Sequence, residues 1–159
     1  MQARPFPLRR RVAVFAVLLM SGAPLFSAHA QDRAAKGTGA TQTLKGAAAQ
    51  KSPQADVFIA YENALIDGGL EAAAKHAAPA KVQENQEMVK AFGIEGFKQM
   101  QAAKRAARVP AAERRKQIQK VEITGDYAYL EAETEQKGVP DVAGFAKTAD
   151  GWKVAPVRR

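Results

Sequence analysis

The stretch GDYAYLEAETE, residues 125–135, decides the fold class of this chain. Small and aliphatic side chains alternate in it with large polar ones, and a period of two is typical of a β-strand with one buried face. Ala128, Leu130 and Ala132 would face a core. The opposite face would carry Tyr127, Tyr129, Glu131, Glu133 and Glu135. Because three carboxylates in a dry pocket would repel one another, we interpret this row as the solvent-facing side of a sheet and not as an active-site lining.

Three further strands are predicted around this stretch. Residues 117–124 place Val121 and Ile123 on one face, and a tight turn at Gly125–Asp126 joins them to the strand that begins at Tyr127. Residues 142–148 and 152–157 form two short extended runs, and the Asp-Gly pair between them favours a hairpin. The second half of the chain therefore predicts an antiparallel meander of about four strands.

Residues 53–108 show the period of a helix instead. Val57, Tyr61, Ala64 and Leu65 have the spacing of one helix face. Prolines and glycines then divide the region into four helical segments, at Gly68–Gly69, Pro79, Gly93 and Pro110. Since the helices precede the strands, we expect an α+β domain with its N-terminal helices packed on one face of a curved antiparallel sheet.

Two turn motifs carry a resemblance to a known superfamily. Val121-x-x-x-Gly125-Asp126-x-Ala128-x-Leu130 is the first, and Lys147-x-x-Asp150-Gly151-Trp152-Lys153-Val154 is the second. Together with the helices before them, over residues 53–157, they resemble small exported bacterial members of the NTF2-like (cystatin-like cone) superfamily. The resemblance implies a conical pocket between helices and sheet, which in different members binds small molecules, mediates dimers or houses catalysis.

The N-terminal residues predict export. Residues 1–11 are basic, residues 12–20 are apolar, and Ala28 and Ala30 form an A-x-A cleavage site. This order is typical of a signal peptide at residues 1–30, cut after Ala30, which implies a periplasmic or secreted protein. Residues 31–52 contain a single large apolar residue, Leu44, and predict a flexible tether. The NTF2-like domain is then residues 53–159.

The charge of the chain lies mostly outside this domain. The whole sequence carries a net charge of +8, but residues 53–159 hold 16 basic and 15 acidic residues. We therefore expect no nucleic-acid partner and, after signal cleavage, no membrane association. Residues 98–120 are locally basic, with eight cations and one glutamate. Two functional interpretations of this run stay open: a surface that binds an anionic envelope polymer, or one face of a homodimer.

The domain lacks the residues that several kinds of catalysis require. The chain has no cysteine, its three serines lie before residue 53, and His76 is the one histidine after the signal segment. Ser or Cys nucleophiles and a conventional zinc site are therefore excluded within the domain, and we expect no metal and no cofactor. Carboxylate or histidine acid/base chemistry remains open, with Asp67 or His76 beside a tyrosine, but each of these residues also has a structural explanation.

These observations predict an exported domain that binds a small ligand or a protein partner and shows no catalytic constellation. The alternatives are an isomerase or dehydratase working in the cone pocket and an envelope protein that binds anionic polymer. Inward-facing positions on the predicted elements give six candidates for the pocket lining: Phe58, Tyr61, Leu65, Phe97, Met100 and Trp152.

Overall fold

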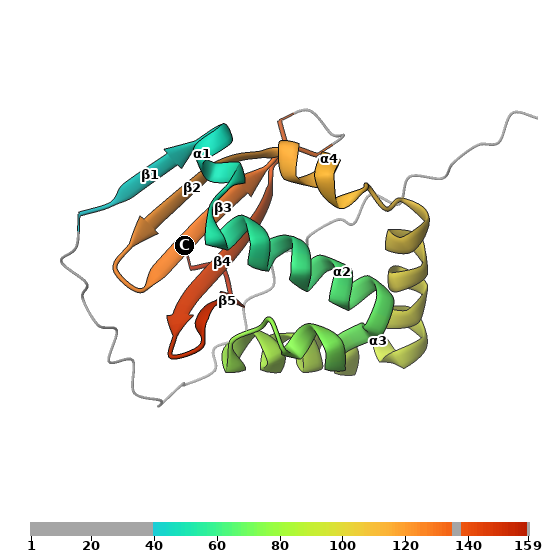
Figure 1. The fold of residues 1–159 in the computed structure, drawn as a ribbon. Helices are drawn as coiled ribbons and strands as arrows, with labels where there is room; N and C mark the ends of the chain where they lie inside the picture. Colours follow the sequence, from blue (N-terminus) through green and yellow to red (C-terminus); the bar gives the residue numbers. More distant parts are fainter. Residues whose placement is uncertain (1–39, 135–137, 159) are drawn as a thin grey trace, which may run out of the picture. The chain divides into compact units, whose positions relative to one another are not determined.

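Helices cover one face of a five-stranded antiparallel sheet in the computed structural model, which describes residues 40–134 and 138–158 (Figure 1). The described residues belong to one compact unit. The predicted signal peptide lies outside them. No helix in the described ranges is long and apolar enough to cross a membrane. The elements, in chain order, are β1 (Gln42–Lys45), α1 (Ala47–Gln50), α2 (Pro53–Ala74), α3 (Pro79–Ala106), α4 (Ala111–Lys116), β2 (Ile118–Thr124), β3 (Tyr127–Ala132), β4 (Asp141–Thr148) and β5 (Gly151–Ala155).

The sheet runs in the order β1-β2-β3-β4-β5, so strands that follow one another in the chain pair with one another. The predicted strand at the centre is β3, and its register places Leu130 between Val121 of β2 and Ala143 of β4. Ala128, Leu130 and Ala132 are at most 1 % exposed, whereas Tyr127 is half-buried on the other face. The interpretation of the Tyr/Glu row as the outer face of the sheet is therefore confirmed for its described residues, while Glu135 lies outside them.

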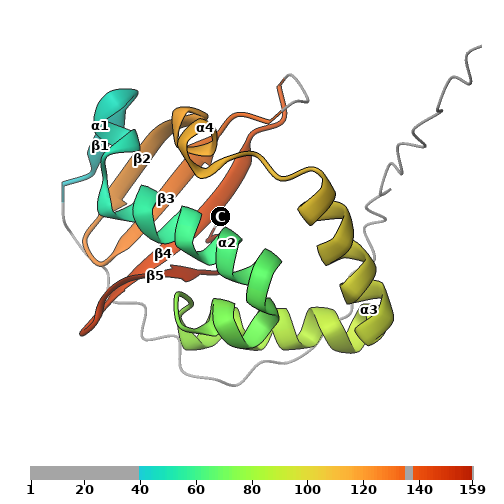
Figure 2. The ribbon, with the colours of Figure 1, turned by 45° about the vertical axis from the view of Figure 1, so that its right-hand side comes forward.

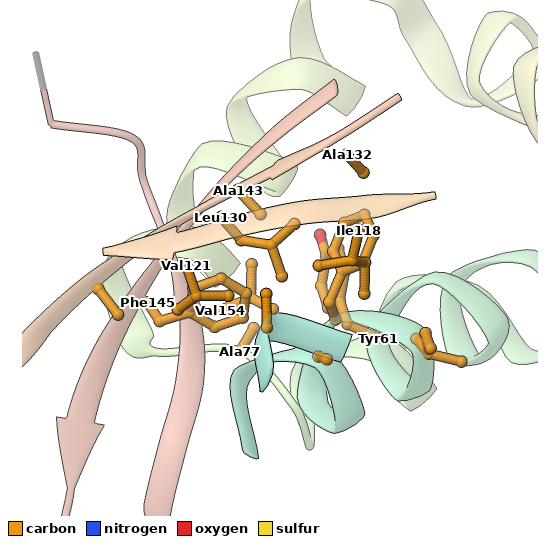
Figure 3. Packing of buried hydrophobic residues seen from close by; sticks show 14 of the residues in the cluster. Tyr61, Ala77, Ile118, Val121, Leu130, Ala132, Ala143, Phe145 and Val154 are labelled. Atoms are coloured by element: carbon orange, nitrogen blue, oxygen red, sulfur yellow. The ribbon is translucent and has the colours of Figure 1, made fainter. Parts of the chain in front are cut away.

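The core lies between this sheet and α2. Figure 3 shows Val121, Leu130 and Phe145 pointing from the sheet toward the helix that carries Tyr61. Burying a large apolar side chain of this kind stabilises a fold by roughly 1.5–3 kcal/mol. The connection between α2 and α3 covers the free edge of β5, because Val154 exchanges main-chain hydrogen bonds with His76 and Ala78. One edge of the sheet is thus protected from pairing with other chains.

The prediction of a tether through Ser52 is wrong for residues 42–52. Gln42–Lys45 form β1 and pair with β2, and Leu44 packs against the core. Ser52 is 3 % exposed, and its hydroxyl accepts a hydrogen bond from the N–H of Ala55 (3.2 Å), which caps α2. The polar composition of this segment hid a short edge strand whose partner lies far along the chain. The sheet accordingly has five strands and not four.

Two glycines break the long helices where the sequence predicts a stop. Gly69 in α2 (φ 72°, ψ −159°) and Gly93 in α3 (φ 74°, ψ 161°) take backbone conformations that are essentially reserved for glycine. The two halves of α3 therefore run in different directions (Figure 2), and the second half contacts α2 through the side chains of Gln101 and Arg105. Residues 111–116, which follow Pro110, form the short helix α4.

Candidate functional site

A cleft lies between α2, α3 and the start of β4. It consists of two adjoining hollows of about 240 and 280 Å³, which share Glu62, Ile66, Lys104 and Asp141 in their walls. The smaller hollow is mainly apolar. Its walls carry three aromatic side chains, two methionines and a leucine: Phe58, Tyr61, Leu65, Met88, Phe97 and Met100. We call it the apolar hollow, and the larger neighbour the polar hollow.

The second half of α3 is held in place by the break in α2. Because α2 is interrupted at Gly69, the carbonyls of Leu65 and Ile66 stand at a helix end. Gln101 donates to the carbonyl of Leu65 (2.7 Å), and Arg105 donates to that of Ile66 (2.5 Å). These two side chains fasten α3 across the end of α2 and so fix one wall of the apolar hollow.

A buried polar pair lies in another wall. The side chains of Tyr61 on α2 and Asn85 on α3 are joined by hydrogen bonds of 2.9 and 3.2 Å, and both residues are less than 9 % exposed. Since each side chain donates one hydrogen bond to the other, the pair stabilises the contact between the two helices and offsets part of the cost of burying its polar atoms. It also leaves the phenol ring of Tyr61 as a flat surface in the hollow.

Arg114 of α4 holds the floor of the polar hollow. Its guanidinium binds both oxygens of Glu62 (2.8 and 2.9 Å), bonds Asp141 at the start of β4, and lies 4.9 Å from the ring centre of Phe58. Burial works to lower the pKa of Arg114, but the hydrogen bonds and charges of Glu62 and Asp141 outweigh it and raise this pKa above its ordinary value. Arg114 is therefore a permanent cation that ties α2, α4 and β4 together.

Lys104 differs from the other cations of the basic run 98–120 in its contacts. The other seven cations of the run each bond a carboxylate or a main-chain carbonyl of the domain: Lys98, Arg105, Arg108, Arg114, Arg115, Lys116 and Lys120. Lys104 has no hydrogen bond or ion pair with any residue that the structure describes, and it lines both hollows. Most of the basic run is thus used within the fold, and its one unengaged cation stands at the cleft.

The sequence profile of the family described as "Putative lumazine-binding" matches residues 55–156. The chain belongs to this family. The family lies in the NTF2-like fold class, in agreement with the resemblance of the two turn motifs. No curated protein and no solved structure matches the chain. The matched range runs from α2 to the end of β5, and it includes every wall of the cleft except Val157.

Five of the six predicted lining residues lie in the walls of one cavity. Phe58, Tyr61, Leu65, Phe97 and Met100 all line the apolar hollow. Trp152 does not. It is half-buried against the core near the turn between β4 and β5, away from the walls of the cleft.

The acid/base candidates are not brought together. Asp67 is paired with Arg108 (2.9 Å) on the surface of α2, and its side chain is 55 % exposed. His76 lies in the connection between α2 and α3, where its carbonyl accepts from Val154. Neither residue lines the apolar or the polar hollow. The tyrosine that does line the cleft, Tyr61, is bonded to Asn85 instead.

Sequence reasoning missed the polar residues of the cleft. Glu62, Asn85, Lys104 and Asp141 each sit among similar polar residues in the sequence, and nothing in their spacing marks them. One signal was usable for Asn85: it falls on the face of α3 that also carries Met88, at a spacing of three residues. The role of Arg114 depends on contacts with α2 and β4, which the local sequence does not contain.

Proposed function

We propose that the cleft binds a small, flat heteroaromatic molecule of the kind that the family's description names, a lumazine. The observation that carries this proposal is the apolar hollow between α2 and α3, with aromatic and methionine side chains in its walls and polar groups at its rim. Ligand sites are commonly of this type, largely apolar with a few placed polar groups. A bicyclic ring system also suits a space of about 240 Å³ that opens into a second hollow.

The lining favours a flat ligand over a flexible aliphatic one. Rings such as Phe58 and Phe97 offer faces for offset stacking, and methionine sulfur makes favourable contacts with aromatic rings. The rim offers Lys104 to the carbonyl oxygens that a lumazine ring carries. The hydrogen bonds of Gln101 and Arg105 to α2 fix part of the wall before any ligand arrives, which lowers the ordering cost of binding.

Isothermal titration calorimetry of the full chain with lumazine tests this proposal. We expect saturable binding of one lumazine per chain. Met100→Trp, which fills the apolar hollow, should weaken this binding at least tenfold, because the larger ring occupies the space of the ligand. Ile94→Trp is the matched control on the same helix, since Ile94 is 55 % exposed and lies outside the cleft. Absence of binding, or equal affinities in both variants, would contradict the proposed site.

We infer that this binding domain works outside the cytoplasm, after removal of residues 1–30. The support is the basic, apolar and small-residue order of that segment. Intact mass spectrometry of the chain expressed in its own cell should give a polypeptide that begins at Gln31 and is found in the exported fraction. A chain that retains Met1 in the cytoplasmic fraction would contradict export.

A further inference from the structure

Strand β4 is longer than its partner β5 at the cleft. The pairing of β4 with β5 ends at Gly144 and Ala155, whereas the pairing of β4 with β3 continues to Asp141. One edge of β4 is therefore open over its first three residues. Asp141, Val142 and Ala143 all line the apolar hollow, so this open edge is part of its wall.

The main chain of Val142 points toward the hollow. In an antiparallel strand, alternate residues direct their N–H and C=O to the same side. The main-chain N–H of Lys147 donates to the carbonyl of Asp126 on the β3 side (2.8 Å). The main-chain groups of Ala143 and Asp141 therefore also point toward β3. Val142 faces the opposite side. Its N–H and C=O have no hydrogen bond with any residue of the described ranges, which leaves an adjacent donor and acceptor in the cleft.

The residues after β5 do not continue its pairing with β4, although Val157 also lines the apolar hollow. Pro156 follows β5 directly. The next residues cross to the outer face, where the N–H of Arg158 donates to the hydroxyl of Tyr127 (2.9 Å). Gly144 permits this path, because a Cβ there would lie 2.6 Å from the carbonyl oxygen of Pro156. Val157 consequently does not pair with Val142.

The open edge is too short to receive another strand. The next residue that would face the same side is residue 140, and it is a proline without an N–H. Val142 is therefore the only donor on this stretch of the edge. Adding a peptide strand requires several successive main-chain bonds, whereas a small molecule needs a single adjacent pair.

We infer that the main chain of Val142 forms two hydrogen bonds with the ligand, one to an acceptor and one to the donor beside it. A cyclic amide or imide carries such an adjacent acceptor and donor along its edge. The N–H of Val142 donates to a ring carbonyl, and its C=O accepts from the neighbouring ring N–H. This inference rests on the proposed function and specifies its ligand class. It predicts rejection of ring systems whose amide nitrogens are blocked, because a site built to hydrogen-bond a group discriminates strongly against analogues that lack it.

Two isomeric ligands test the inference on the full chain. In 6,7-dimethyllumazine both methyl groups are on the pyrazine ring and both N–H groups are kept. In 1,3-dimethyllumazine both amide nitrogens are methylated. The two isomers have the same atoms and almost the same apolar area, so a difference in affinity reports the hydrogen bonds that the 1,3-isomer cannot form. We expect calorimetry to show that the 6,7-isomer binds at least about tenfold more tightly.

A main-chain variant tests the same contact from the protein side. Val142→Pro removes only an N–H that is free of the sheet, and proline is tolerated in a strand when its N–H side faces outward. We expect it to weaken the 6,7-isomer about tenfold and to leave the weak binding of the 1,3-isomer unchanged. Val142→Ala keeps the N–H and should bind like the original chain. Should Val142→Pro fail to fold by circular dichroism, an ester bond in place of the Val142 amide removes the same N–H without the ring.

The outcomes separate the two proposals. Equal affinity of the isomers, or unchanged binding in a folded variant without the Val142 N–H, would overturn the role of Val142 and leave the cleft as the binding site. Failure of lumazine and both isomers to bind would overturn the proposed function itself.

Discussion

Arg114 joins residues that are far apart in the sequence, and its environment is unlike that of its neighbour Arg115. The Arg114 side chain is 14 % exposed and bonds two carboxylates, those of Glu62 and Asp141. Arg115 is 36 % exposed, pairs with the exposed Asp56 and donates to the carbonyl of Gln50 (2.7 Å). The two arginines follow one another in α4 and have the same charge. They therefore form a matched pair for separating a structural cation from a surface one.

Replacing Arg114 by methionine should lower the free energy of unfolding by about 2–3 kcal/mol, since two carboxylates then remain in the floor of the cleft without their cation. Arg115→Met should cost less, about 1–2 kcal/mol, because it loses one exposed ion pair to Asp56 and one hydrogen bond to the carbonyl of Gln50. Urea unfolding followed by circular dichroism measures both. Similar losses in the two variants would show that Arg114 does not have the clamping role inferred from its contacts.

Lys120 belongs to the outer face of the sheet and gives a prediction in pH. Its hydrogen bond to Glu131 is the largest influence on it and, with a smaller contribution from Glu122, raises the pKa of Lys120 above its ordinary value of 10.5. A raised pKa means that folding stabilises the protonated lysine, so its contribution is complete below that ordinary value and is lost as pH rises through the folded pKa.

The stability difference between the original chain and Lys120→Gln should accordingly be constant from pH 7 to about pH 9 and shrink toward alkaline pH. It should stay below about 1 kcal/mol, because the pair is partly exposed. Unfolding midpoints of both chains across this range provide the measurement. A difference that grows above pH 10 would have the wrong sign.

Individual residues were predictable from the sequence where burial decides their place. Alternation identified the inward residues of β3, and helical spacing identified Tyr61 and Leu65 as residues of an inner face. The polar groups of the cleft were not predictable in this way, because a charged residue is recognised as buried only through its partner. Arg114 finds its partners on α2 and β4, and Val142 contributes main-chain atoms that its side-chain identity does not report.

At the scale of elements, α3 owes its two directions to Gly93. The neighbouring Gly96 lies within regular helix, where an added Cβ would be 3.6 Å from Phe92, an ordinary contact. Nothing lies within 4 Å of a Cβ added at Gly93, so a substitution there is opposed by the backbone conformation alone. The two glycines thus differ in conformation and not in available space.

Gly93→Ala should destabilise the protein by about 1–3 kcal/mol, because alanine is strained at this φ and ψ. Gly96→Ala should stabilise it by about 0.5–1 kcal/mol, since alanine loses less entropy than glycine in a helix. Thermal and urea unfolding of both variants check the signs. A stabilised Gly93→Ala would mean that α3 runs straight through residue 93.

The boundaries of the helical segments were predictable from the positions of proline and glycine in the sequence. Proline and glycine positions predicted where the helical segments begin and end, since these residues act on the backbone locally. Strand β1 was missed for the opposite reason. Its four residues are mostly polar, and what makes them a strand is the edge of β2 at residues 120–123. The prediction of a tether averaged composition over a segment whose second half is stabilised by distant pairing.

At the scale of the whole molecule, β1 and α1 extend the fold on the N-terminal side of Pro53, at least as far as Gln42. A chain that begins at Pro53 loses the cap of α2 at Ser52, the packing of Leu44, and Ala49, which is fully buried. We expect it to be at least about 2 kcal/mol less stable than a chain that begins at Ala40. Urea unfolding of the two truncated chains measures this difference. Equal stability would restore the tether interpretation for residues 42–52.

The position of β1 also has a consequence for the order of folding. Gln42 pairs with Ile123, so the first described strand must wait for almost the whole chain before its partner exists. Contacts between such distant residues make folding slow, because the loop must close before the contact forms. β2 to β5, by contrast, pair with their neighbours in sequence. A growing chain therefore leaves the synthesis machinery with residues 40–52 unpaired, and β1 completes the sheet after β2 has been made.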